Sequence, residues 1–462
     1  MNLIISKNAS VNYLAKIVEI KNFYPHPDPE VTRMKCASID GFTICVGIDE
    51  PEGLYVYFPT SCEINPHLLS FANLYRKKYY NANPEEKAGF FEENGRVKAI
   101  KLRGQVSEGF LLPFTVFNRF IEDNLNLSLE TPLPGLEFDT VENDGKEFWI
   151  NKKYIPQSFN RIRDGNSKIT RSTKKYSKII EDQFRFHYDT IRVQKEPWCI
   201  SPDDLIHISS KIHGTSGISA YVLCKRPPTF KEKIANLILG KRWNDDIIFY
   251  DYIYSSRSVI KNSEYNPNLS NGYYGCDVWA EADKAIRPLL KKGMTVYYEI
   301  VGYTPTNSYI QKNYDYGCRP LIDGETYTDE IHFKIRVYRI TLTNVDGIVH
   351  EFSAREVQTW CINNGLIPVK ELYYGYAKDL YPEISTDNII EWQTEFWNKL
   401  ANDKSFYMEL NSPECYNKVP HEGIVIKKED SKSRAWKLKT FAFLNNEGKE
   451  LDKGEVNIED IS

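Results

Sequence analysis

The sequence predicts an α+β protein with two main domains. Its 462 residues exceed what one ordinary hydrophobic core organises. Up to about residue 115 the chain reads as short β-rich runs separated by turns, and from about residue 186 to 443 strands alternate with helical stretches. Hydrophobic residues at 41% and charged residues at 26% are typical of a globular protein. We therefore expect a small N-terminal β-barrel domain, a connector, and a larger C-terminal domain of sheets with flanking helices.

The N-terminal domain, expected over residues 1–115, contains four β-rich runs. They span residues 13–20, 34–39, 42–47 and 54–58. Asp40-Gly41, between the second and third runs, is a hairpin signal. Short strands at this spacing suggest a small barrel, and the five-stranded OB-fold is a barrel that often binds nucleic acid. In Tyr75–Tyr80 cations and aromatic rings are interleaved, which suits stacked bases, although an ordinary polar helix face is equally consistent.

Residues 116–185 are predicted to be a basic connector with some helix, and residues 446–462 an acidic tail. Between Lys152 and Lys178 the sequence has nine Lys or Arg and a single acid, Asp164. The net charge of the whole chain is −4, so the total charge does not by itself indicate a nucleic-acid partner. The local basic segment is compatible either with a phosphate backbone or with a solvated linker.

Several classes of protein are disfavoured by the composition. No apolar run approaches the roughly 20 residues of a membrane span, and the first residues lack the apolar core of a signal peptide. The nine cysteines include no Cys-x-x-Cys pair, which predicts reduced thiols and neither a disulfide framework nor a zinc site. The eight histidines show no metal-ligand spacing either. We expect a cytoplasmic monomer without membrane contact.

Six clusters of polar and charged residues follow one another in the C-terminal domain. The first, Lys211-Ile212-His213-Gly214-Thr215-Ser216, places a lysine at a turn between two strands, where it is either a nucleophile or an ordinary surface lysine. The other five are Ser255–Ser258, Tyr297–Tyr303, Arg336–Thr341, His421–Lys427 and Trp436–Lys439. Each has a bland explanation as turn, core or solvated strand, but six in this order are improbable by accident.

These residue types fit nucleotidyl transfer to a lysine. A lysine attacks phosphorus only as the neutral amine, and nearby cations with partial burial favour that form. Arg257, Lys437 and Lys439 would supply positive charge around the phosphate oxygens, as would a bound metal. Lys437 and Lys439 share one face of their strand because side chains alternate with period two. Lys211 is the candidate nucleophile.

Three further residues have candidate roles toward a nucleotide. Glu422, at the start of an apolar strand, would be a metal-shell carboxylate. Glu299, in a buried-looking strand, would accept a hydrogen bond from a ribose hydroxyl. Tyr338 offers a flat face for the base.

The clusters carry a family resemblance. Lys211–Ser216 resembles motif I of the ATP-dependent RNA ligases in the covalent nucleotidyltransferase superfamily. The later clusters are similar to motifs Ia, III, IIIa, IV and V at Ser255–Ser258, Tyr298–Gly302, Val337–Ile340, Glu422–Lys427 and Lys437–Lys439. Residues 310–318 resemble a segment of phage-encoded members. The resemblance implies an adenylyltransferase domain over residues 186–445, with Ile212 and Ser216 also binding the nucleotide.

The N-terminal part resembles one branch of these ligases. Residues 17–28 resemble the start of OB domains of the tRNA-binding type, and residues 102–109 resemble the end of the OB domain that precedes the catalytic domain in RNA ligases that seal nicks with an RNA 3′-OH strand. His213 stands where DNA ligases and capping enzymes typically have Asp, and the 23 residues after Lys439 are too few for the OB domain of those cousins. Ser210, Tyr338 and Arg339 depart from the common pattern, where Glu, Phe and an acid occur.

The resemblance implies an ATP-dependent RNA ligase that uses Mg²⁺ or Mn²⁺ near Glu422. Lys211 would form a lysyl-AMP, AMP would pass to a 5′-phosphate, and a 3′-OH would displace it. The partner would be RNA or an RNA/DNA nicked duplex, and the location the cytoplasm, of a host if the enzyme is phage-encoded. A capping-type guanylyltransferase and a non-catalytic nucleic-acid-binding homologue are the alternatives. Whether the substrate is a duplex nick, a tRNA break or single-stranded ends stays open.

Overall fold

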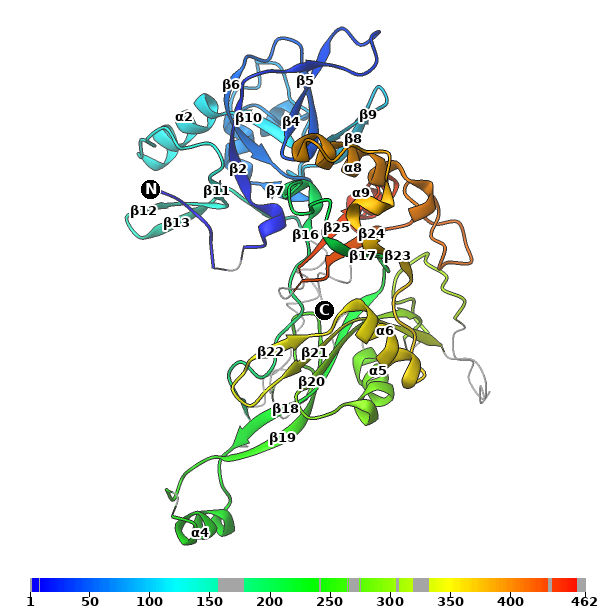
Figure 1. Cartoon of the computed structure of the whole chain (residues 1–462). Coiled ribbons are helices and arrows are strands. Elements are labelled where there is room, and N and C mark those ends of the chain that lie inside the picture. The colour runs from blue at the N-terminus through cyan, green and yellow to red at the C-terminus, as the bar shows by residue number, and fades with distance from the viewer. Residues whose placement is uncertain are drawn as a thin grey trace. The chain divides into compact units, whose positions relative to one another are not determined.

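The computed structural model forms two compact units, each built from several stretches of the chain. The described residues are 2–7, 9–156, 178–240, 242–263, 265, 274, 276–304, 307–318, 332–430 and 434–454. The first unit comprises residues 1–156, 189–199 and 441–454, and the second comprises residues 157–188, 200–440 and 455–462 (Figure 1). Most of the basic segment, residues 157–177, and the end of the acidic tail lie outside the described residues.

Four strands of the first unit lie within two residues of the four β-rich runs predicted from the sequence. They are β2 (Ala15–Ile20), β4 (Met34–Ile39), β5 (Phe42–Gly47) and β6 (Gly53–Phe58). The predicted hairpin is confirmed, because β4 and β5 pair antiparallel with Ile39 opposite Phe42. Asp40 turns the chain with φ of 52°, a conformation that Asp tolerates better than most residues.

The remaining strands of the first unit are short and fall into separate antiparallel sheets. They are β1 (Leu3–Ile4), β3 (Tyr24–Pro25), β7 (Cys62–Ile64), β8 (Ala99–Leu102), β9 (Gln105–Glu108), β10 (Phe110–Pro113), β11 (Glu137–Phe138), β12 (Thr140–Asn143), β13 (Lys146–Trp149) and β14 (Asn151–Lys153). A further short strand, β16 (Ile191–Arg192), belongs to none of these sheets. The sheet orders are β10-β6-β2-β11, β3-β4-β5, β1-β12-β13, β8-β9 and β14-β7. Among the described residues, these pairings do not close into one barrel.

The first unit extends past residue 115 into the stretch expected to be a connector. Helix α2 (Phe114–Leu125) buries Phe117, Phe120 and Ile121 in the same core as Ile17 and Val56. Strands β11 to β14 follow and add Phe138 to that core. The polar composition of this stretch conceals its apolar face, because the buried residues recur at helical spacing.

Two more helices belong to the first unit, α1 (Pro66–Phe71) and α9 (Phe441–Asp452). Asp452, near the end of α9, accepts bonds from Arg96 Nη2 at 2.5 Å and Lys98 Nζ at 2.8 Å. Arg96 is buried and also donates to the Gly448 carbonyl at 2.9 Å. The first residues of the expected acidic tail are therefore helical and held by the first unit.

The second unit contains a six-stranded antiparallel sheet, called here the long sheet. Its strands are β15 (Lys178–Ile179), β18 (Thr215–Arg226), β19 (Ile247–Ser256), β20 (Met294–Gly302), β21 (Phe333–Thr343) and β22 (Val349–Glu351), in the order β15-β18-β20-β21-β22 with β19 paired to β18. Helices α5 (Val278–Ile286) and α6 (Ala354–Asn363) cover one face of the long sheet (Figure 1). They bury Trp279 and Val357 against Val296, Ile300 and Val337.

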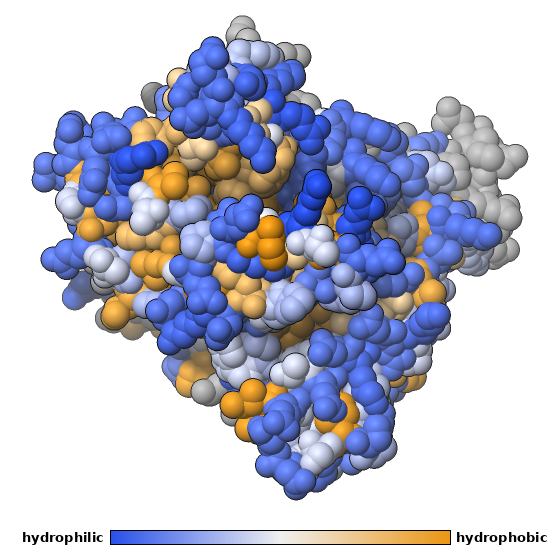
Figure 2. Space-filling model, turned by 90° about the horizontal axis from the view of Figure 1, so that it is seen from above, coloured by the Kyte–Doolittle hydropathy of each residue, from blue (hydrophilic) through white to orange (hydrophobic). Residues whose placement is uncertain are grey.

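The second unit also contains a smaller antiparallel sheet, called here the short sheet. Its strands are β17 (Leu205–Ser210), β23 (Glu371–Tyr376), β24 (Gly423–Lys428) and β25 (Ala435–Lys439), in the order β25-β24-β17-β23. In the described residues the other α-helices of this unit are α4 (Phe230–Ile238), at the tip of the β18–β19 ribbon, α7 (Ala377–Leu380) and α8 (Ile389–Asn402). No helix in the described residues has the length and apolar content to cross a membrane, and the face in Figure 2 is mostly hydrophilic.

Candidate active site

The Lys211 turn joins the two sheets of the second unit. Strand β17 of the short sheet ends at Ser210, and β18 of the long sheet begins at Thr215. The Lys211 amide donates to the Gly423 carbonyl of β24 at 2.9 Å. The Tyr316 hydroxyl accepts from the His213 amide at 3.1 Å and donates to the His213 carbonyl at 2.8 Å. The turn is thus fixed by hydrogen bonds on both sides of the nucleophile candidate.

Two glycines let the backbones at this turn come close together. A Cβ on Gly214 would lie 2.4 Å from the Ile300 carbonyl oxygen of β20. Gly423 has φ of +136°, and a Cβ there would lie 2.0 Å from the Leu438 carbonyl oxygen. Both glycines belong to the clusters that the sequence singled out, and each is required by steric contact with a neighbouring strand.

Glu422 is the centre of the charged part of the site. Lys211 Nζ lies 2.8 Å and Lys439 Nζ 3.3 Å from its Oε1 atom. His213 Nδ1 lies 3.7 Å from its other oxygen. The Glu422 side chain is only 1% exposed, so its charge is compensated by the two lysines and hardly by water. The structure therefore brings together three of the predicted residues, Lys211, Glu422 and Lys439.

Glu422 could also hold a divalent cation. Within the described residues neither of its oxygens accepts a hydrogen bond of good geometry, and a carboxylate oxygen is a ligand that Mg²⁺ and Mn²⁺ prefer. No group of three or more His, Cys, Asp or Glu able to bind a metal occurs in the described part of the chain.

Glu422, Lys437 and Lys439 form one wall of the site. The long sheet supplies a second wall, formed by Ser216, Glu299 and Tyr338. Ser216 of β18 lies opposite Glu299 of β20 in the antiparallel register. The Ser216 and Tyr338 hydroxyls are 2.9 Å apart. Burial, followed by the negative charge of Glu299, raises the pKa of Tyr338 above its ordinary value, so its hydroxyl stays protonated. These three predicted residues are also brought together.

Tyr338 lies at a β-bulge. Tyr297 pairs with Arg339 while Tyr298 pairs with Val337, so Tyr338 is the extra residue on β21. A bulge changes the direction of a side chain relative to regular alternation and is common beside active sites. The period-two pattern of the sequence could not have located it.

His187 links the remaining predicted residues to the site. Burial lowers its pKa well below the usual range, and positive charges lower it further. These come, in decreasing order, from Arg339, Arg257, Lys211 and Lys437. The positive charges of Arg257 and Lys437 therefore lower the pKa of the same imidazole as the charge of Lys211. The His187 ring meets Tyr338 edge-on at 5.0 Å between ring centres.

Sequence reasoning missed His187 and the role of Gln311. His187 belongs to no cluster, and only the packing of its segment onto β20 and β21 brings it near the site. Gln311 donates to the Gly214 carbonyl at 2.7 Å. The resemblance did single out residues 310–318, which contain both Gln311 and Tyr316, but could not show that they support the Lys211 turn. Ile212, within that turn, is buried.

The chain shares its fold with solved structures of an RNA ligase. No protein-family model and no curated protein sequence matches the chain. Among solved structures, a variant of the RNA ligase of Naegleria gruberi solved with ATP and Mn aligns with a TM-score of 0.51 and 16% identity, over 94% of this chain and 99% of that chain. A variant of the same ligase with AMP and Mn gives 0.52 and 15%, over 94% and 98%. The likeness shows a common fold along nearly the whole length of both proteins.

Proposed function

We propose that this protein is an ATP-dependent RNA ligase that joins 3′-OH and 5′-phosphate ends through a lysyl-AMP intermediate. The observation that carries the proposal is the placement of Lys211 Nζ at 2.8 Å from a buried carboxylate, Glu422, which also binds Lys439. The fold likeness to an RNA ligase solved with ATP, AMP and Mn supports it.

In the first step the Lys211 amine attacks the α-phosphorus of ATP. The ammonium group first gives a proton to solvent, and the neutral amine then forms the nitrogen–phosphorus bond as the bond from the α-phosphorus to the pyrophosphate oxygen breaks. Pyrophosphate leaves, and the nitrogen releases a second proton to solvent to give the phosphoramidate. Arg257, Lys437 and Lys439 bring positive charge close to the phosphate oxygens, which stabilises the negative charge that develops there in the transition state. Glu422 would hold Mg²⁺ or Mn²⁺, and that cation would neutralise phosphate charge.

The second wall of the site would bind the nucleoside. The Glu299 carboxylate accepts a hydrogen bond from a ribose hydroxyl, and the Tyr338 ring packs against adenine. Ser216, 2.9 Å from the Tyr338 hydroxyl, holds the ring in orientation. Ile212 lies in the turn between the two walls.

In the later steps AMP passes to a 5′-phosphate, and a 3′-OH then attacks that phosphate and releases AMP. The first unit, proposed to be an OB-type nucleic-acid-binding domain, would hold the nicked strand whose 3′-OH end is RNA. Its exposed Tyr79 lies beside Tyr80, with 4.5 Å between ring centres, and offers a face for base stacking.

Labelling with α-³²P-ATP and Mg²⁺ or Mn²⁺ tests the first step. Wild-type protein should take a covalent label that Lys211→Ala loses, while Lys292→Ala, which changes an exposed lysine before β20, should keep it. Wild-type protein that takes no label from any of the four nucleoside triphosphates would refute a ligase. A preference for GTP would instead support a capping-type guanylyltransferase.

Matched nicks test the substrate. We expect sealing of a duplex nick with an RNA 3′-OH strand, and much slower sealing of an all-DNA nick. Equal sealing of single-stranded ends would contradict the nick assignment. Nick binding without label or sealing would support the non-catalytic homologue.

A further inference from the structure

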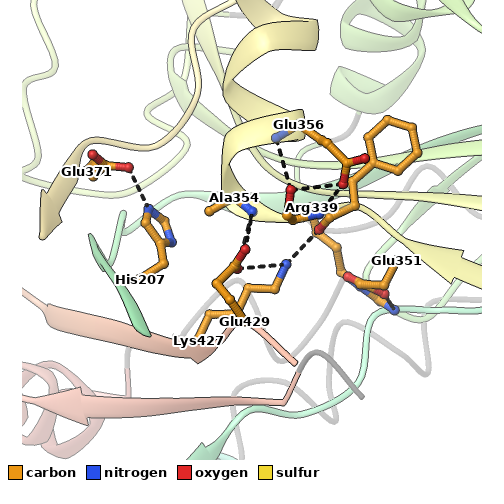
Figure 3. Close-up of polar contacts among 10 residues, drawn as sticks. His207, Arg339, Glu351, Ala354, Glu356, Glu371, Lys427 and Glu429 are labelled. Atoms are coloured by element: carbon orange, nitrogen blue, oxygen red, sulfur yellow. Dashed lines mark hydrogen bonds and ion pairs between the residues drawn. The ribbon is translucent and has the colours of Figure 1, made fainter. Parts of the chain in front are cut away.

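A polar tie joins the end of β24 in the short sheet to the beginning of helix α6 (Figure 3). Lys427 Nζ donates to the Phe352 carbonyl at 2.7 Å. The Ala354 amide points to both oxygens of Glu429, at 3.2 and 3.0 Å. Lys427 Nζ also lies 3.6 Å from Glu429 Oε1. These contacts of Lys427 and Glu429 are called here the α6 clasp.

One backbone amide in the first turn of helix α6 needs a hydrogen-bond acceptor from outside the helix. Ser353 and Glu356 form a capping box, in which each side chain accepts from the backbone amide of the other. That box leaves the Ala354 amide among the unpaired donors of the first turn. Glu429 accepts from it, and a carboxylate is favoured at this end of the helix dipole. Both clasp side chains are largely buried, which strengthens the interaction.

A second contact lies beside the clasp. Arg355 of α6 pairs with Glu371 of β23 at 3.0 Å, and its guanidinium lies 4.0 Å from the ring centre of Tyr374. Glu371 is also 3.6 Å from His207 of β17. Figure 3 draws this contact as a dashed line. Helix α6 is therefore attached to strands β24 and β23 of the short sheet, and Glu371 of β23 in turn contacts β17.

The same helix is packed on the long sheet. Val357 and Cys361 of α6 share a core with Val337 and Ile340 of β21. Tyr338 lies between those two residues of β21. The clasp thus connects the wall that carries Glu422, Lys437 and Lys439 to the wall that carries Tyr338 and Glu299.

We propose that Lys427 and Glu429 are positioning residues that fix the separation of the two walls of the nucleotide site. The proposal rests on the proposed function, because it assigns ATP to both walls at once. Without the clasp the walls separate more easily, and ATP must use part of its binding free energy to bring them together. The binding of ATP weakens, while the rate of adenylylation at saturating ATP changes little.

The next strand residue supplies a matched control. Lys428 Nζ pairs with Asp204 at 2.7 Å, and its side chain is 19% exposed, against 13% for Lys427. Asp204 directly precedes β17, so this ion pair stays within the short sheet. Lys428→Met therefore removes a similar ion pair without releasing α6.

The experiment measures single-turnover adenylylation against ATP concentration for wild type, Lys427→Met, Lys427→Arg and Lys428→Met. We expect Lys427→Met to raise the ATP concentration for half-maximal rate about tenfold and to change the maximal rate by less than about threefold. Lys427→Arg should restore most of the affinity, and Lys428→Met should keep the wild-type value. Hydrogen exchange at the Ala354 amide should accelerate in Lys427→Met alone.

Equal ATP dependence of Lys427→Met and Lys428→Met, with an active wild type, would overturn the clasp and leave the proposed function standing. Loss of maximal rate with unchanged ATP dependence would also overturn it. A wild-type protein without adenylylation would overturn the proposed function and this role together.

Discussion

Replacing Glu422 by glutamine tests how the charged part of the candidate active site is held together before any nucleotide binds. Glutamine keeps the size and shape of the side chain and removes its negative charge. Lys211 and Lys439, at 2.8 and 3.3 Å from Oε1, then lose their common counter-ion in a buried place.

The expected loss of stability follows from which charges remain. Removing one partner of a buried ion pair typically costs about 3–5 kcal/mol, because the other charge stays buried and unpaired. The side chains of Lys211 and Lys439 keep 16% and 14% exposure, so water partly compensates them. We therefore expect about 2–3 kcal/mol for Glu422→Gln. Lys439→Met leaves Glu422 paired with Lys211, and we expect a smaller loss of about 1 kcal/mol.

Denaturant unfolding followed by tryptophan fluorescence measures these differences, with the slope of the transition checked for constancy. Glu281→Gln is the control, since Glu281 pairs with Lys284 at 2.8 Å on the surface of α5 and should contribute less than about 1 kcal/mol. A Glu422→Gln protein as stable as wild type would refute the reasoning. So would a loss for Lys439→Met that exceeds the loss for Glu422→Gln.

Three other substitutions test the surroundings of the site. Gly214→Ala should lower the free energy of unfolding by about 1–3 kcal/mol through steric overlap, as measured by denaturant unfolding. Gly47→Ala, with no atom within 4 Å of its Cβ, should change it by less than about 0.5 kcal/mol, and equal effects would contradict the steric argument. Tyr316→Phe leaves the buried His213 amide and carbonyl without their hydroxyl partner, which should cost about 1–3 kcal/mol and slow adenylylation; an unchanged rate and stability would refute this. Burial lowers the pKa of His421 from 6.5 to about 4, so between these values the unfolded chain binds a proton that the folded protein does not. The stability contribution of this group is full above pH 6.5 and is lost by about 1.4 kcal/mol per unit as the pH falls, and His421→Gln should flatten the measured slope between pH 6.5 and 5. A difference between wild type and His421→Gln that is independent of pH would contradict the assignment.

The strands and the order of the clusters were predictable from the sequence, because both depend on local patterns. The Asp40-Gly41 hairpin needs only two adjacent runs and a turn, and it is confirmed. The meeting of Lys211, Glu422 and Lys439 depends on the register of β17, β24 and β25, in which Gly423 lies opposite Lys439. A resemblance to known motifs anticipated their association, while no local pattern could give the distances.

Long-range packing explains what the sequence did not show. The connector reads as polar because the apolar residues of α2 are spaced three or four apart among charged ones, and only the core of the first unit reveals their common face. The bulge at Tyr338 arises from the pairing of β20 with β21 and leaves no mark in composition. The contribution of His187 likewise requires two strands that are remote from it in sequence.

The way the chain passes between the two units has a practical consequence. It changes unit at residues 156/157, 188/189, 199/200, 440/441 and 454/455. Only Thr440 separates Lys439 from helix α9 of the first unit. A single cut near residue 180 therefore cannot isolate the second unit, because it leaves α9 without Arg96 and Lys98, and Arg192 without its 2.5 Å contact to Glu108. Recombination at one breakpoint would produce the same orphaned segments. The two units are therefore expected to be inherited as a pair. A minimal fragment of the second unit would need residues 189–199 and 441–454, which belong to the first unit, removed or redesigned.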